Sequence, residues 1–237
     1  MEPSRLSRTH PRAITTKVEG LARVDGSARF AFGKTAALAS ISGPIEVRIA
    51  AELPSTATFE VLHRPLSNIP GTQSKVLASS IRAALLPSLI LTQNPRTLVQ
   101  LVVQSLGSKL CDALVASMVN ASTLALLSAG SVPMRSVVCA VAVGRTKDGA
   151  FVVDPSEDDV GLLQASGCFA FAFGQAADEA RCVWTNWRSL DGASFSEKDL
   201  SACRKLGWEA AQEVRTHIHG LVGEGEPDEE MEEEVRD

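Results

Sequence analysis

The stretch NASTLALLSAGSVPMR, residues 120–135, closes the most apolar segment of this 237-residue chain. It is the second half of residues 110–129, which are apolar around most of the circumference of a helix, as in a helix buried in a soluble core. The segment is nearly long enough to span a membrane, but Asp112, Asn120 and several Ser and Ala residues argue against that role. Gly130 is a residue type that commonly ends a helix. We therefore expect a buried helix over residues 110–129.

Further elements are expected on both sides of this helix. Residues 27–32 and 35–42 are separated by Gly33-Lys34, a spacing typical of a β-hairpin. Helices are expected over residues 75–86 and 196–219, the second with Ser196 and Asp199 as a capping pair and Gly220 at its end. The other strands are expected over residues 47–51, 57–63, 97–104, 136–143, 150–153, 168–173 and 181–187. This pattern predicts a single α/β (α+β) domain over residues 18–222, with mixed sheets packed against helices.

The net charge of −5 is distributed unevenly along the chain. Residues 223–237 hold nine acidic residues and one Arg, whereas residues 1–12 hold three Arg and one Glu. The intervening residues carry 19 basic and 18 acidic side chains, so the net charge does not exclude RNA as a partner. Both ends are polar, and we expect a disordered N-terminal head over residues 1–17 and a disordered acidic tail over residues 223–237.

The sequence carries no pattern typical of a metal or cofactor site. The five Cys residues are scattered without a CxxC pair, as is usual for reduced thiols inside a cell. His217 and His219 are two positions apart, whereas chelation from a helix needs i, i+4 spacing. We therefore expect neither a metal nor a cofactor.

Four stretches of the chain together indicate a family. They are VDGSARF (residues 24–30), ASISGPIE (39–46), VLHRP (61–65) and residues 120–135, and residues 149–155 and the last helix continue the pattern. These stretches resemble the RNase PH family, and most closely the RNase PH-like subunits of the eukaryotic RNA exosome core. The resemblance covers roughly residues 18–220 and departs from the family pattern by an extra Ser131.

The resemblance implies a βαβα-type duplication whose chains pair as dimers and then form a six-membered ring. Active members of the family degrade RNA from its 3′ end with phosphate as the nucleophile. The implied partners are other RNase PH-like subunits, including a direct dimer partner, cap subunits with RNA-binding domains, a catalytic exosome nuclease, and RNA in the central channel. The implied location is the nucleus and nucleolus, and also the cytoplasm, without a membrane.

The catalytic positions of the family are degenerate in this chain. They are Thr72 and Gln73 in place of two arginines, Lys109 in place of the phosphate-loop arginine, and Ser166 in place of the catalytic aspartate. Gly107 and Ser108 still match the phosphate loop, but Lys109 offers a point charge instead of the bidentate fork of Arg. The residues expected to contact RNA are Arg82, Arg96, Lys109, Arg135 and Arg145.

These observations predict a non-catalytic structural subunit of the exosome core ring, which supports RNA processing and decay through assembly and channel formation. The alternative is an active phosphorolytic or hydrolytic 3′–5′ exonuclease acting as a homodimer. That enzyme would release nucleoside diphosphates or monophosphates from RNA without other subunits.

Overall fold

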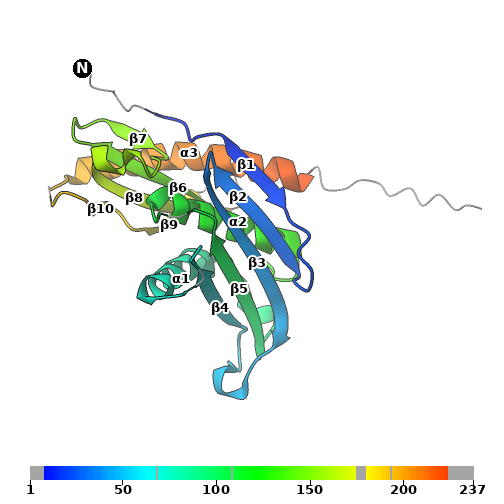
Figure 1. The fold of residues 1–237 in the computed structure, drawn as a ribbon. Coiled ribbons are helices and arrows are strands. Elements are labelled where there is room, and N and C mark those ends of the chain that lie inside the picture. Colours follow the sequence, from blue (N-terminus) through cyan, green and yellow to red (C-terminus); the bar gives the residue numbers. More distant parts are fainter. Residues whose placement is uncertain (1–7, 68, 108, 175–179, 193, 224–237) are drawn as a thin grey trace, which may run out of the picture.

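The buried helix expected from the sequence lies at the centre of the molecule. The computed structural model describes residues 8–67, 69–107, 109–174, 180–192 and 194–223, and in it α2 (Asp112–Ala129) packs between two sheets (Figure 1). All residues of α2 up to Leu126 are buried, and Gly130 ends it in the left-handed conformation, with a φ of 62°. By length and composition α2 could cross a membrane, but 83% of it is buried inside the protein, as in a core helix.

The first sheet has the strand order β1-β2-β3-β5-β4. Its strands are β1 (Ile14–Val18), β2 (Gly26–Phe32), β3 (Thr35–Glu46), β4 (Thr58–Arg64) and β5 (Thr97–Ser105). The expected hairpin is confirmed, since Phe32 of β2 pairs with Thr35 of β3, and β4 runs parallel to β5. Helix α2 packs against β2, β3 and β5, and α1 (Thr72–Leu85) packs against β4.

The strand expected over residues 47–51 is wrong. Ile49–Ala51 form a short 3-10 turn, η1, in which Ile49 is 90% exposed. The last pair of β3 joins Glu46 to Thr97, the first residue of β5. Beyond this pair no strand of the described residues lies beside the chain, and a segment without a partner cannot form a ladder. Two further 3-10 turns, η2 (Leu86–Ser88) and η3 (Leu91–Gln93), connect α1 to β5.

The second sheet has the order β10-β8-β6-β7, with β9 also paired to β8. Its strands are β6 (Val137–Thr146), β7 (Phe151–Val153), β8 (Leu163–Phe173), β9 (Ala180–Thr185) and β10 (Arg188–Ser189). A short 3-10 turn, η4 (Asp159–Leu162), lies between β7 and β8. Strands β6 and β8 are buried along almost their whole length, because α2 and α3 (Glu197–Gly223) both pack against them. Asn120 ties α2 to this sheet: its amide donates to the Ala140 carbonyl at 2.8 Å and accepts the Ala140 N–H at 2.7 Å.

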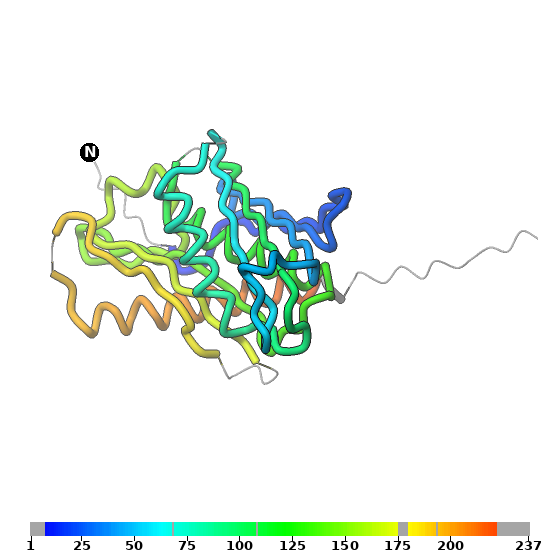
Figure 2. Tube along the Cα trace, turned by 90° about the horizontal axis from the view of Figure 1, so that it is seen from below, coloured from blue at the N-terminus to red at the C-terminus, as the bar shows by residue number. Residues whose placement is uncertain are grey.

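Helix α3 confirms the expected start but not the expected end. The Asp199 N–H donates to Ser196 Oγ at 3.2 Å and the Ser196 N–H donates to Asp199 Oδ2 at 3.0 Å, which is the reciprocal cap. The helix continues through Gly220 to Gly223 and runs along one side of the molecule (Figure 2). A glycine permits a helix to end but does not force it to do so.

The N-terminal head is shorter than the sequence suggests. Residues 1–7 lie outside the described part of the chain, but residues 14–18 form β1 on the edge of the first sheet. Before β1, the Arg8 carbonyl accepts the Val153 N–H at 2.7 Å and the Ala13 carbonyl accepts the Gly33 N–H at 2.8 Å. The expected disorder of residues 8–17 is therefore wrong, because this polar segment finds partners in both sheets. The acidic tail beyond Gly223 also lies outside the described residues.

Candidate functional site

The loop between β5 and α2 contains the positions that resemble a phosphate loop. Gly107 and Lys109 lie in it with the Lys109 side chain exposed, whereas Ser108 falls outside the described residues. Helix α2 begins after Cys111, with no side chain capping its first N–H groups. An uncapped helix N-terminus attracts anions. Burial raises the pKa of the Cys111 thiol, so this sulfur is not poised as a nucleophile.

Asp112, the first residue of α2, accepts hydrogen bonds from three side chains. Its carboxylate is 5% exposed, and Ser166 Oγ of β8 donates to Oδ2 at 2.6 Å. On the other oxygen, Asn186 Nδ2 donates to Oδ1 at 3.1 Å and Arg188 Nη1 donates to Oδ1 at 2.8 Å. The structure thus brings Ser166, predicted as a degenerate site position, to the start of α2, where a carboxylate from the helix faces it.

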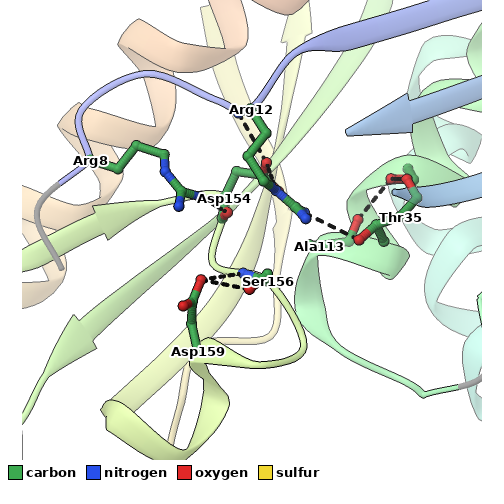
Figure 3. A network of polar contacts seen from close by, with 8 residues as sticks. Arg8, Arg12, Thr35, Ala113, Asp154, Ser156 and Asp159 are labelled. Atoms are coloured by element: carbon green, nitrogen blue, oxygen red, sulfur yellow. Dashed lines mark hydrogen bonds and ion pairs between the residues drawn. The ribbon is translucent and has the colours of Figure 1, made fainter. Parts of the chain in front are cut away.

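A second buried carboxylate, Asp154, directly follows β7 (Figure 3). It is fully buried, and its φ of 50° is unusual for a non-glycine residue. Arg12 Nε donates to Oδ2 at 2.6 Å and Arg12 Nη2 donates to Oδ1 at 2.9 Å, so the guanidinium binds the carboxylate in a bidentate manner. The Arg12 backbone N–H donates to Oδ2 at 3.1 Å, and Arg8 Nη1 donates to the Asp154 carbonyl at 3.0 Å.

Arg12 also links the second sheet to the first. Figure 3 shows its side chain reaching from Asp154 toward Thr35 and the first turn of α2. Nη2 donates to Thr35 Oγ1 at 3.2 Å, and Ser117 Oγ of α2 donates to the Thr35 carbonyl at 3.2 Å. Burial by itself opposes the charge on Arg12, but the hydrogen bonds and the attraction of Asp154 raise the pKa of its guanidinium. The two side chains therefore form a buried ion pair beside the start of α2.

Sequence reasoning missed this ion pair and the donors around Asp112. Arg12 and Asp154 are 142 residues apart, and Asp112 and Arg188 are 76 residues apart. Neither spacing belongs to a local motif. The sequence signal that could have pointed to Asp154 is its place at the end of a buried strand, within the stretch over residues 149–155.

The two positions expected at the start of α1 are exposed. Thr72 and Gln73 are the first residues of α1, and Gly71 precedes them without a side-chain cap. Within the described part of the chain, no side-chain hydrogen bond or ion pair joins either residue to Asp112 or Asp154.

The five residues expected to contact RNA are spread over the molecule. Arg96, just before β5, forms an ion pair with Glu52 at 3.3 Å. Arg145, near the end of β6, pairs with Asp199 of α3 at 3.2 Å, and Arg82 of α1 donates from Nε to a β4 carbonyl at 3.0 Å. Lys109 and Arg135 are exposed. The structure therefore does not gather the five into one cluster within this chain.

The chemistry available at this site is limited by its internal contacts. Both buried carboxylates beside α2, Asp112 and Asp154, are held by donors from this chain. In each case an arginine from another element holds the carboxylate in place. Among the residues that the structure describes, no group of three His, Cys, Asp or Glu side chains could hold a metal ion.

The chain is similar to known proteins over most of its length. Residues 10–131 match the family described as the 3′ exoribonuclease family, domain 1. The chain is 29% identical over 217 residues to the exosome complex component RRP46 of Saccharomyces cerevisiae, covering 89% of this chain and 95% of the relative. It is 33% identical over 224 residues to the human exosome complex component RRP41, covering 89% of this chain and 86% of the relative.

Two solved structures share the fold. The crystal structure of rice Rrp46 superposes with a TM-score of 0.78 at 24% identity, covering 91% of this chain and 97% of that chain. The Archaeoglobus fulgidus exosome with RNA bound to the active site gives a TM-score of 0.72 at 15% identity, covering 89% of each chain. The two-sheet arrangement around α2 is therefore an architecture found in solved proteins.

Proposed function

Since the chain belongs to the RNase PH family of 3′ exoribonucleases, we propose that it is a structural subunit of an RNA exosome core ring and is not itself catalytic. The assembly part of the proposal is supported by the Saccharomyces cerevisiae relative named exosome complex component RRP46 and the rice relative named exosome complex exonuclease RRP46 homolog. The relatives from Saccharomyces cerevisiae and rice match over 95% and 93% of their own lengths, so the likeness is not limited to a shared motif.

The non-catalytic part is supported by Ser166, which the resemblance places at the position of the catalytic aspartate, and by the pairing of the buried carboxylate Asp154 with Arg12. Asp154 is the fully buried carboxylate beside the start of α2, and Arg12 occupies both of its oxygens. Around the same loop, Lys109 stands in place of an arginine fork, and Thr72 and Gln73 stand in place of two arginines. A site without these cations has lost the groups that hold the RNA backbone and the attacking phosphate.

The catalytic half is tested with the purified chain, labelled RNA and inorganic phosphate. We expect no release of nucleoside diphosphates or monophosphates, because the binding and proton-transfer groups are missing or engaged. Asp154→Asn and Lys109→Ala serve as matched variants. If the wild-type chain releases either product and both variants abolish that release, the chain is an active exonuclease and the proposal is refuted.

The assembly half is tested by the mass of the native complex that contains the chain. We expect a ring with other RNase PH-like subunits, together with cap subunits and a catalytic nuclease. A stable homodimer as the sole species would exclude the ring role. Tagged chain observed by microscopy would test the proposed location in nucleus, nucleolus and cytoplasm.

Contact with RNA in the channel is tested by salt dependence in the assembled ring. Each cation that neutralises a phosphate of single-stranded RNA adds about 0.7 to the slope of log K against log salt. We propose that Arg82, Arg96, Lys109, Arg135 and Arg145 contribute to this slope. Alanine at these positions should lower it, whereas Lys34→Ala, a charge removal on the exposed turn between β2 and β3, should not. An unchanged slope would exclude channel contact by the five residues.

A further inference from the structure

A groove of about 870 Å³ runs along the free edge of β4. Its floor includes β4 from Thr58 to His63. One wall is α1, with Lys75 and Arg82, and the other is the end of β3 and the turn that follows, with Arg48. The groove is thus a channel beside an edge strand, outside the network around α2.

One edge of β4 faces this groove without a neighbouring strand. Within the described residues β4 pairs only with β5, so its other edge is free. Arg82 of α1 donates from Nε to the Phe59 carbonyl at a distance of 3.0 Å. Because α1 lies on that side of β4, this carbonyl points to the free edge. Alternate residues of a strand direct their N–H and C=O groups the same way. Val61 and His63 therefore offer a row of donors and acceptors to another strand.

His63 adds an unpartnered polar atom to the floor of the groove. The residue is 7% exposed, and its Nε2 lies 2.7 Å from Ser105 Oγ. Its buried Nδ1 has no hydrogen-bond partner in the described part of the chain. This nitrogen is shielded from solvent, so a ligand in the groove does not reach it without a local rearrangement.

The walls of the groove favour a protein ligand with acidic side chains. Arg48 and Lys75 are exposed on opposite walls of the groove, and within the described residues neither has an ion-pair partner. The carboxylate of Glu60, in contrast, accepts a hydrogen bond from Gln100 at 3.1 Å. Among the exposed large apolar side chains, Leu62, at 36% exposure, lines the groove between these cations and the strand edge.

Single-stranded RNA fits the same groove less well. Its aromatic lining residue is Phe59, which is 3% exposed and offers no face on which a base could stack. Glu46 and Glu60 also line the groove and would oppose any anionic ligand, carboxylate or phosphate, so they do not distinguish the two. An extended peptide, in contrast, matches the backbone edge and the alternation of apolar and charged contacts.

We propose that β4 accepts an extended, acidic segment of another protein chain as an added strand of the first sheet. The segment pairs with the free edge at Val61 and His63 and places carboxylates near Arg48 and Lys75. The proposal does not depend on the ring assignment, since it rests on the groove of this chain.

The test uses the full chain and a fluorescein-labelled peptide of five Val-Glu repeats, followed by fluorescence anisotropy. We expect saturable binding, no binding of five Val-Lys repeats, and roughly tenfold weaker binding by Lys75→Glu because of the reversed charge. Lys34→Glu, the same change on an exposed turn away from the groove residues, should bind like the wild type. Equal binding by Lys75→Glu and Lys34→Glu would overturn the proposal.

Hydrogen exchange supplies a readout of strand addition itself. The amides of Val61 and His63 should exchange more slowly when the Val-Glu peptide is bound. Binding without this protection would mean that the peptide does not add to β4. Labelled oligouridylate that binds the wild type, loses affinity with Lys75→Glu and displaces the peptide would assign the groove to RNA instead.

Discussion

Replacing Arg12 by Met tests the ion pair that joins the N-terminal segment to both sheets. The Arg12 side chain is 18% exposed and the Asp154 carboxylate is 0% exposed, so the substitution leaves a buried carboxylate without its cation. Met retains an unbranched stem of similar length, which limits the loss of packing. The main effect of Arg12→Met is therefore electrostatic.

The expected cost follows from the bonds that disappear. Three charge-assisted hydrogen bonds are lost, two to Asp154 at 2.6 and 2.9 Å and one to Thr35 at 3.2 Å, and each such bond contributes about 1.5–3 kcal/mol. The bond from the residue 12 backbone N–H at 3.1 Å remains and offsets part of this loss. Removing one partner of a buried pair costs about 3–5 kcal/mol, so we expect the free energy of unfolding to fall by about 3 kcal/mol near neutral pH.

Urea unfolding measures this change, with Lys17→Met as the matched control. Lys17 lies 3.4 Å from Glu19 but is 69% exposed, so its removal should cost less than about 1 kcal/mol. In Arg12→Met, the buried Asp154 gains a proton more easily in the folded state than in the unfolded state. A raised folded-state pKa stabilises the protein at low pH, so the deficit of the variant should shrink as the pH falls.

A double-mutant cycle with Asp154→Asn separates the pair from other effects. Asn tolerates the positive φ of residue 154, so the backbone is preserved. We expect a coupling energy of about 2 kcal/mol or more between the two positions. Additive costs, or a cost of Arg12→Met no larger than that of Lys17→Met, would refute the role assigned to the pair.

Three further substitutions probe the first helix turn, the β4 groove and the centre of the fold. Asp112→Asn should lower the free energy of unfolding, measured by urea denaturation, by about 2 kcal/mol, because a neutral amide replaces a carboxylate that accepts from three donors. One of these donors, Arg188, is half-exposed, which limits the cost. Burial lowers the pKa of His63, so the wild type should lose stability as the pH falls below about 6.5. His63→Gln should lack this part of the pH dependence. Equal slopes of unfolding free energy against pH for both proteins would contradict the prediction. Gly26→Ala should cost about 3 kcal/mol or more, since its Cβ would lie 2.5 Å from a carbonyl oxygen of α2, while Gly20→Ala, with nothing within 4 Å, should change stability by less than about 0.5 kcal/mol.

The elements that the sequence predicted well are those with local signals. The helix over residues 110–129 was predicted from its apolar circumference, and α2 occupies residues 112–129. The hairpin around Gly33 and the cap formed by Ser196 and Asp199 depend on neighbours within a few residues, and both are present. Signals of this kind depend only on residues within a short window of the sequence, so the sequence alone reveals them.

The errors arise where a local pattern competes with a distant partner. Residues 47–51, apolar apart from Arg48, have no partner strand among the described residues, and Ile49–Ala51 form a turn instead of a strand. Residues 8–17 look polar and unstructured in isolation, yet Arg12 finds a buried carboxylate and residues 14–18 find an edge of the first sheet. In both cases the deciding contact lies far along the chain.

The sequence alone determined the class of the fold, the central helix and the family resemblance, because periodicity, caps and motif stretches are local. The resemblance also predicts a phosphate-loop remnant at Gly107, Ser108 and Lys109, which stays a prediction. Only the tertiary structure decided that Asp154 is held by Arg12 and that Ser166 donates to Asp112. Those pairs, 142 and 54 residues apart, form because two sheets close on one helix, and no spacing along the chain encodes that closure.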